Sequence, residues 1–522
     1  MVKAAIKVRW WGQALVAGTV FILALWVFIP AANAGYVPFN PGSNYLEAFP
    51  NYKVAAIMVT FSDNPAKPAQ DSSTQPWTKQ YVNGVLFSNT YSVAAYYTEV
   101  SGGEVSVSGS VFDNNGAWYT VPRPATVNGD CDWSSYFGDA VAAADADIDF
   151  TQYNSIMVFS PQKTCAAEGL ATYYAVPEAG SRLYGIIDIN GRMGSTPHHE
   201  LAHLMGLGHA NSWQCDAPGI VTGTNCRNVE YGDRYNIMGA TGSRTLLLTA
   251  QQLENYGWLP AADVVTVSTS NDYTIRAYQS RGTLPRVLKI PQARDSSGNV
   301  TSWYYLEYRQ PIGFDKVTIN YSPTVQQLGV PNGVLVHMGN STGDRFSSTL
   351  LDMTPGSMPG GRDIFEPALP LGYSYSDPAA GVSFGVLSRD ANKMTIRVKF
   401  NPKSLCILYT PAVSVKELTG TGRPGQELRY EVTVRNRSVL CGKQNYELRT
   451  LAGLKGWTVT VDKQKTSVLS IVSGQTRTYD VRVTSPKNSK YQKYALTLEA
   501  RWTQQPSYKT AVVLRPVIAR AK

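Results

Sequence analysis

The residues best suited to chemistry in this chain are histidines. There are only five, and four of them lie within twelve residues: His198, His199, His203 and His209. Neutral imidazole is a good zinc ligand, and helix residues four apart share one face. We therefore predict that His199 and His203 bind one zinc ion from a helix, with His209 as the third ligand. His198 points about 100° away around that helix and is predicted to flank the site at the surface.

The residues between these histidines complete a reaction centre. The pattern H-E-x-x-H-x-x-G-x-x-H places Glu200 beside the first ligand and Gly206 where the helix must end. Glycine tolerates the left-handed backbone that turns His209 back toward the ion. Three protein ligands leave the fourth zinc position to water, which is typical of catalytic zinc. We predict that Glu200 is the general base, taking a proton from this water and passing it to a departing amine.

Two alternatives stand beside this interpretation. A bare H-E-x-x-H occurs by chance on ordinary helices, but the added Gly206 and His209 argue against chance. A zinc site without activity is the second alternative, although every catalytic position is intact. Thr196-Pro197 is predicted to start the helix, with Thr196 as N-cap and Pro197 in the first turn.

A second element follows the histidines. Residues 231–239 read YGDRYNIMG, and the NIMG portion resembles the Met-turn of metzincin zinc peptidases, with Met238 as its methionine. Within the metzincins the chain resembles the gametolysin family, with some likeness to immune inhibitor A-type peptidases. Three further stretches carry this resemblance: VAAIMVTFSD at 54–63, SVAAYYTEVSGG at 92–103 and LTAQQL at 248–253.

The resemblance implies a fold and an activity. It implies a secreted endopeptidase in which Met238 forms an apolar floor under the zinc ligands, with extracellular matrix or cell-wall glycoproteins among the substrates. It also implies that the strand before the zinc helix, expected at 183–188, edges the cleft and pairs with an extended substrate. Ala240 stands where astacin-type sites carry a tyrosine ligand, so that ligand has no counterpart.

The N-terminus has the layout of a secretory signal. Basic residues precede an apolar run of about 16 residues from Ala14 to Ile29, and Ala32-Asn33-Ala34 offers a cleavage site. The run is shorter than the roughly 20 residues that span a bilayer. We predict a cleaved signal peptide at 1–34, a secreted or surface-associated protein, and no membrane span after its removal. The formal net charge then falls from +9 to +6, and no Lys/Arg block suggests a nucleic-acid partner.

Six cysteines in an exported chain suggest disulfides, although six allow 15 pairings. Pairing neighbours is simplest and gives Cys131–Cys165, Cys215–Cys226 and Cys406–Cys441. Cysteine metal ligands are disfavoured because no C-x-x-C spacing occurs. No cysteine before the zinc helix has the P-R-C-G context of a cysteine switch, so the sequence gives no mechanism of latency.

Length and strand patterns predict an α+β chain of about three domains. The signal peptide is followed by a metzincin-type catalytic domain at 35–260, with a mixed sheet and a zinc-binding helix. A β-rich accessory domain at 261–402 and an Ig-like β-sandwich at 403–522 complete the chain. Asp352, Asp363 and Asp377 are candidate calcium ligands, but no D-x-D-x-D-G loop supports calcium, so solvated turn residues are favoured.

The prediction is thus a secreted zinc endopeptidase that acts on a protein or peptide substrate. One alternative is a secreted adhesin or carbohydrate- or wall-binding protein on an inactive peptidase scaffold, which would bind zinc without turnover. Another is a zinc amidase that acts on wall peptides. The sandwich could attach the protein to carbohydrate or serve only as a spacer.

Overall fold

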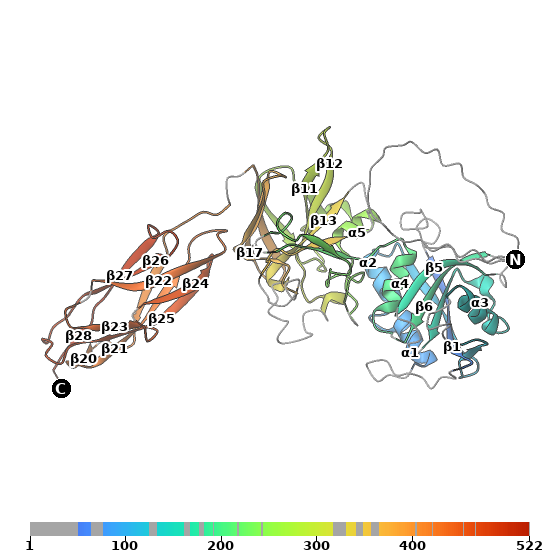
Figure 1. Ribbon diagram of the computed structural model, residues 1–522, viewed down its shortest axis with the longest axis horizontal. Coiled ribbons are helices and arrows are strands. Elements are labelled where there is room, and N and C mark those ends of the chain that lie inside the picture. The colour runs from blue at the N-terminus through green and yellow to red at the C-terminus, as the bar shows by residue number, and fades with distance from the viewer. Residues whose placement is uncertain are drawn as a thin grey trace.

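A computed structural model of the chain describes residues 51–63, 77–124, 133–160, 168–176, 182–191, 193–216, 219–241, 244–316, 330–340, 348–356, 365–401, 405–419, 421–452, 454–464 and 466–520. The predicted signal peptide, the predicted pair Cys131–Cys165 and the calcium candidate Asp363 lie outside these ranges. The described part is mostly β-sheet, with the few helices concentrated before residue 256 (Figure 1).

The first sheet is mixed, as the sequence predicts. Its strands are ordered β2-β1-β4-β6-β5, with β3 paired to β1, and all of these pairings are parallel except that of β5 with β6. Along β1 alternate residues enter two different cores, Val54 and Ala56 one and Ala55 and Ile57 the other, so both faces are covered. The strands are β1 (Asn51–Phe61), β2 (Ser106–Phe112), β3 (Tyr119–Val121), β4 (Ser155–Ser160), β5 (Gly169–Val176) and β6 (Arg182–Asn190).

Helices cover the two faces of this sheet. One core contains side chains of α1 (Lys79–Asn83), α2 (Val93–Val100), α4 (Thr196–Leu204) and α5 (Ala250–Asn255), and the other contains those of α3 (Trp133–Ala144). Helices α1 and α2 are separate, because a π-helical turn at Gly84–Ser88 follows α1, and Ser92, whose side chain caps α2, starts a new helix. Short 3-10 turns lie at Phe150–Gln152, Ala261–Asp263, Gly313–Asp315 and Val330–Asn332.

The edge of the sheet beside α4 is β5. The sequence-based expectation placed the cleft-edging strand at 183–188, but those residues lie in β6, which is paired on both sides. The order is reversed because the chain passes through the outer strand β5 first and returns antiparallel as β6 before it enters α4. Helix α4 packs against both strands (Figure 1).

Two further sheets enclose a separate core. An eight-stranded sheet, with the order β8-β7-β14-β13-β12-β11-β9 and β15 beside β13, packs against a four-stranded sheet, β10-β18-β17-β16. Two of its strands, β7 (Asn211–Gln214) and β8 (Arg227–Val229), come directly after the histidine motif. Because β7 pairs with β14, the chain on either side of residue 260 shares one sheet. The others are β9 (Val264–Thr266), β10 (Asn271–Arg276), β11 (Val287–Arg294), β12 (Val300–Glu307), β13 (Gly333–Asn340), β14 (Thr349–Leu351), β15 (Leu369–Pro370), β16 (Ser374–Asp377), β17 (Val382–Arg389) and β18 (Lys393–Phe400).

The C-terminal strands form two four-stranded sheets around a further core, with the orders β19-β21-β25-β23 and β24-β22-β26-β27. Every second side chain of β21 is buried, as in a strand with one face on a core. Strands β20 and β28 form a small separate pair. The strands are β19 (Ala412–Glu417), β20 (Thr421–Gly422), β21 (Glu427–Arg435), β22 (Lys443–Ala452), β23 (Thr458–Val461), β24 (Ser467–Val472), β25 (Thr476–Thr484), β26 (Leu496–Trp502), β27 (Lys509–Leu514) and β28 (Val517–Ile518).

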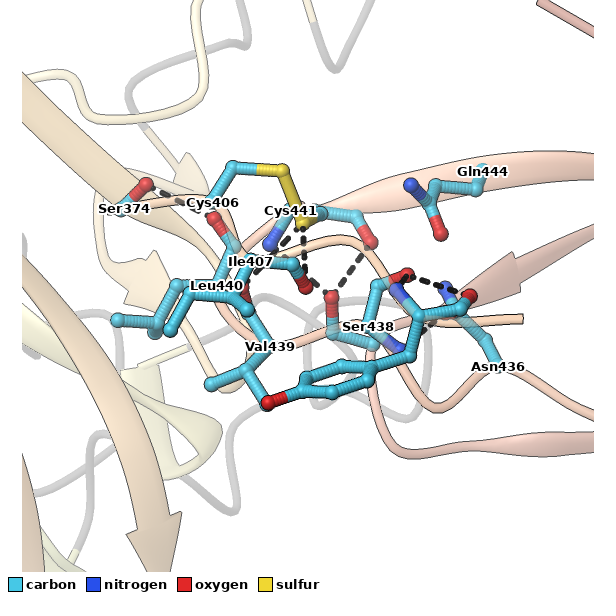
Figure 2. The surroundings of a disulfide bond; sticks show 12 residues. Ser374, Cys406, Ile407, Asn436, Ser438, Val439, Leu440, Cys441 and Gln444 are labelled. Carbon is cyan, nitrogen blue, oxygen red and sulfur yellow. Dashed lines mark hydrogen bonds between the residues drawn. A yellow bond between two sulfur atoms is a disulfide. The ribbon is translucent and has the colours of Figure 1, made fainter. Parts of the chain in front are cut away.

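Two of the predicted disulfides are confirmed. Cys406 bonds Cys441 where the chain enters the C-terminal sheets, and the neighbouring Leu440 carbonyl accepts a hydrogen bond from Ser374 of β16 (Figure 2). Cys215 bonds Cys226 between β7 and β8. Both bonds are compatible with an exported protein. Among the described residues, no helix is long and apolar enough to cross a membrane.

Candidate metal and catalytic site

The zinc-motif helix forms where the sequence predicts it. Helix α4 begins at Thr196, with Pro197 in its first turn, and the N-cap is Ser195, one residue earlier than expected. His199 and His203 lie one turn apart on the same face, and their Nε2 atoms are 3.1 Å from each other. The helix therefore aims two ring nitrogens at one point.

The third histidine reaches this point because the helix stops at glycine. Gly206 has a φ of +95°, the left-handed backbone that was expected of it. The chain then turns back, and ligand atoms of His199, His203 and His209 all lie within 4.8 Å of one another. These three residues could hold a metal ion.

The hydrogen bonds of the rings fit a cation. The Nδ1 of His199 lies 2.9 Å from the Ile237 carbonyl oxygen, and the Nδ1 of His203 lies 2.7 Å from that of Leu207. A carbonyl only accepts, so each Nδ1 carries the hydrogen and each Nε2 presents a lone pair. Burial lowers the pKa of His199 to about 4 and that of His203 to about 3, so both rings are neutral at pH 7. Two lone pairs facing each other at 3.1 Å are reconciled by a positive ion between them.

Glu200 faces the cleft from the same helix. It is only 6% exposed, and burial, with a smaller contribution from the Asp188 carboxylate, raises its pKa to about 8. The start of edge strand β5 lies against this side chain, because a Cβ placed on Gly169 would be 2.4 Å from Glu200 Oε1. Glycine at 169 therefore lets the carboxylate lie against the edge strand.

The predicted Met-turn ties the ligand segments together through its backbone. Asn236 Oδ1 accepts a hydrogen bond from the Met238 N–H, which closes the turn. The Ile237 carbonyl holds the His199 ring, and the Met238 carbonyl accepts from the N–H of Ala210, directly after His209. Met238 itself is fully buried in the core that contains α4.

Sequence reasoning missed a buried ionic cluster behind this turn. His337, the one histidine outside the motif, lies with its Nε2 3.0 Å from Asp233 Oδ2, while Asp233 Oδ1 accepts the N–H of Tyr235. Glu307 and Arg309 are paired next to it, and Arg309 also binds Asp315; the five charged residues are at most 3% exposed. The isolated His337 was a visible signal in the sequence, but its partner lies 104 positions away.

Tyr231 is a second residue that the sequence did not single out. Its ring lies over that of His209, with centroids 3.7 Å apart, and its φ of +57° is rare for a side-chain-bearing residue. The His209 ring also has a hydrogen-bonding partner, since its Nδ1 lies 2.7 Å from Glu230 Oε1. Tyr231 thus covers the third ligand from the solvent side, where it is 39% exposed.

Two expectations need correction. His198 does not lie at the surface; it is 2% exposed and packs edge-on against Tyr96, because its side of α4 faces α2. Asp352 and Asp377 are buried rather than solvated: Asp352 accepts the N–H of Thr354, and Asp377, the last residue of β16, accepts the N–H groups of Ala379 and Ala380 in the following turn.

A cleft of about 510 Å³ lies in front of these residues. Its walls combine α4 and the start of β5 on one side with the Met-turn and the residues after it on the other. The lining residues are Glu168, Gly169, Ser195, Thr196, His199, Glu200, Tyr231, Arg234, Ile237, Gly239, Ala240 and Thr241. The candidate base and one histidine are therefore accessible from an open, partly polar groove.

Comparisons with known proteins identify no family. No protein-family profile and no curated protein matches the chain. Solved structures that resemble it include a family 123 glycoside hydrolase from Clostridium perfringens (9% identity, 22% of this chain and 28% of that chain, TM-score 0.18). Others are a sporulation control protein from Bacillus subtilis (14%, 22% and 51%, TM-score 0.16) and a beta-glucosidase from Listeria innocua (15%, 23% and 17%, TM-score 0.15). At these TM-scores nothing follows about function.

The buried cluster predicts a pH-dependent stability. Burial lowers the pKa of His337, but Glu307 and Asp233 raise it more, so the net pKa lies above 6.5. A raised pKa means that the stabilisation is complete below about pH 6.5 and is lost as pH rises through the folded-state pKa. We expect His337→Gln to lower the free energy of unfolding by about 3–5 kcal/mol at pH 6, since it leaves buried carboxylates unpaired.

The measurement is thermal unfolding of both proteins from pH 6 to pH 9 with a chelator present. The gap between their melting temperatures should narrow as pH rises. Parallel curves would show that His337 is not charged in the folded protein.

Proposed function

We propose that this protein is a secreted zinc metalloendopeptidase whose N-terminal part has the metzincin fold and resembles the gametolysin family. The observation that carries the proposal is the convergence of three histidines beside a buried glutamate in an open cleft. The donor set supports zinc, because neutral imidazoles are its common ligands and three of them leave one position open. In this proposal the later β-rich region and the C-terminal sandwich are accessory parts.

Each residue at the site then has a definite task. His199 and His203, through Nε2, and His209 would hold a zinc ion, which when bound polarises a carbonyl and acidifies water. The positive charge of a bound zinc ion would lower the raised pKa of Glu200, so that its carboxylate accepts a proton from the attacking water and donates it to the nitrogen of the departing amine. The hydrogen bonds from the ring Nδ1 atoms to Ile237 and Leu207 keep the lone pairs of the ligands pointing inward.

The edge strand supplies a way to hold the substrate. Among the described strands β5 is the last of its sheet and pairs with β6, a position at which an extended peptide can add as a further strand. The strand begins at Gly169, which lies against Glu200. A peptide that adds to this edge would carry one of its carbonyls past the base and the histidines, which favours cleavage within a chain.

The first test compares wild type with Glu200→Ala on a gelatin or broad peptide substrate, each with zinc and each with a chelator. We expect the wild type to cleave the substrate and the chelator to stop the cleavage. The variant should still bind one zinc per chain, but its kcat should fall by about 100- to 10,000-fold. Metal content and cleavage are measured on the same preparations.

Other outcomes separate the alternatives. A wild type that holds zinc, cuts no protein and still binds wall polymer would favour the adhesin reading, especially if Glu200→Ala binds equally well. Turnover of wall peptides without turnover of gelatin or casein would favour the amidase.

The contact between Gly169 and Glu200 gives a sharper prediction. In Gly169→Ala the new methyl group meets the mobile end of the Glu200 side chain, so the fold survives but the carboxylate is displaced. We expect unchanged zinc content and a fall in kcat on the order of 10- to 100-fold, because small misplacements of a catalytic group are costly.

The control is Gly116→Ala, whose methyl group meets no atom within 4 Å, although the φ of +90° at this turn strains alanine and should lower stability slightly. It should keep wild-type kcat. Equal activity of Gly169→Ala and wild type would show that Glu200 does not act from this position.

A further inference from the structure

The cleft has an unequal distribution of charge. Glu168 and Glu200 belong to the wall made by α4 and the start of β5, whereas Arg234 belongs to the wall made by the Met-turn segment. Among the described residues that line the cleft, Arg234 is the only lysine or arginine. A ligand lying between the two walls would therefore meet carboxyl groups on one side and a guanidinium group on the other.

Arg234 is fixed in place without being neutralised. Its guanidinium carbon lies 4.2 Å from the centroid of the Phe365 ring, a cation–π contact that leaves the N–H donors at the rim of the group available. Phe365 is itself held, since its carbonyl accepts a hydrogen bond from the Tyr235 hydroxyl. No carboxylate in the described part of the chain forms an ion pair with Arg234.

Three acidic residues near Arg234 or in the same cleft have other contacts. Asp233, the preceding residue, is buried and paired with His337. Glu230 contacts the His209 ring, and Glu200 lies against Gly169 on the opposite wall. A half-buried, stacked arginine that lines a cleft and forms no ion pair with the described residues is suited to bind an anionic group from outside.

We propose that Arg234 binds a carboxylate of the substrate and so makes this cleft selective for acidic peptides. The inference rests on the proposed peptidase function and adds a substrate class to it. Guanidinium and carboxylate form charge-assisted, often bidentate hydrogen bonds, which Lys cannot reproduce in geometry. The carboxylate could come from an Asp or Glu side chain or from the C-terminus of the substrate, and peptides distinguish the two.

The experiment uses three peptides of one backbone sequence: one with Asp at a varied position and an amidated end, one with Asn there and an amidated end, and one with Asn and a free C-terminal carboxylate near the cut. Cleavage is measured with zinc, and binding is measured by fluorescence anisotropy with a chelator, where nothing is cut. The Asp position is scanned along the peptide.

At the preferred position, the wild type should favour a carboxylate peptide over the amidated Asn peptide by about tenfold or more in both readouts. Arg234→Gln should abolish that ratio, and Arg234→Glu should reverse it so that the amidated Asn peptide is preferred. The control Arg227→Gln removes the same charge from the exposed strand β8 and should keep the wild-type ratio. Preference for the Asp peptide assigns a side-chain carboxylate, and preference for the free-acid peptide assigns the chain terminus.

Equal ratios in wild type and Arg234→Gln, or a wild type with no carboxylate preference, would overturn the inference. Failure of the peptidase proposal is seen separately, as absence of chelator-sensitive cleavage. In that case the binding ratios still decide whether Arg234 recognises a carboxylate.

Discussion

The turn from Asp233 to Gly239 is the constraint on which the rest of the site depends. Through backbone atoms alone it orients the His199 ring and anchors the residue after His209. It has little freedom of its own, because a Cβ on Gly239 would lie within covalent distance of the Asp233 carbonyl oxygen. Imidazole geometry at the proposed metal site is therefore inherited from this turn as much as from helix α4.

The turn is held by a set of buried ionisable side chains, whose removal from water costs free energy. Carboxylates removed from water are stable only when partners satisfy them, and here Arg309 and His337 serve Glu307, Asp315 and Asp233. The turn is therefore held only when strands β12 and β13, which carry Glu307 and His337, are in place. The rigidity of the histidine site thus depends on strands of the eight-stranded sheet, which lie far along the chain from the histidines.

The sequence predicted what depends on local chemistry and failed where pairing is distant. His199, His203 and Gly206 follow from helix periodicity and backbone freedom, so their placement could be read directly. The edge position of β5 depends on which strand the chain visits first, and no local pattern encodes that order. The Asp233–His337 contact was equally hidden, because two polar residues 104 positions apart carry no mark of their partnership.

The region after residue 260 contributes directly to the structure of the candidate site. β7, which begins two residues after His209, pairs with β14, and β13 beside it delivers His337 to the Met-turn. A unit cut at 260 would leave Asp233 buried without its partner and β7 without its neighbour. The eight-stranded sheet is therefore a structural part of the candidate site, and the accessory label suits only the sheets beyond it.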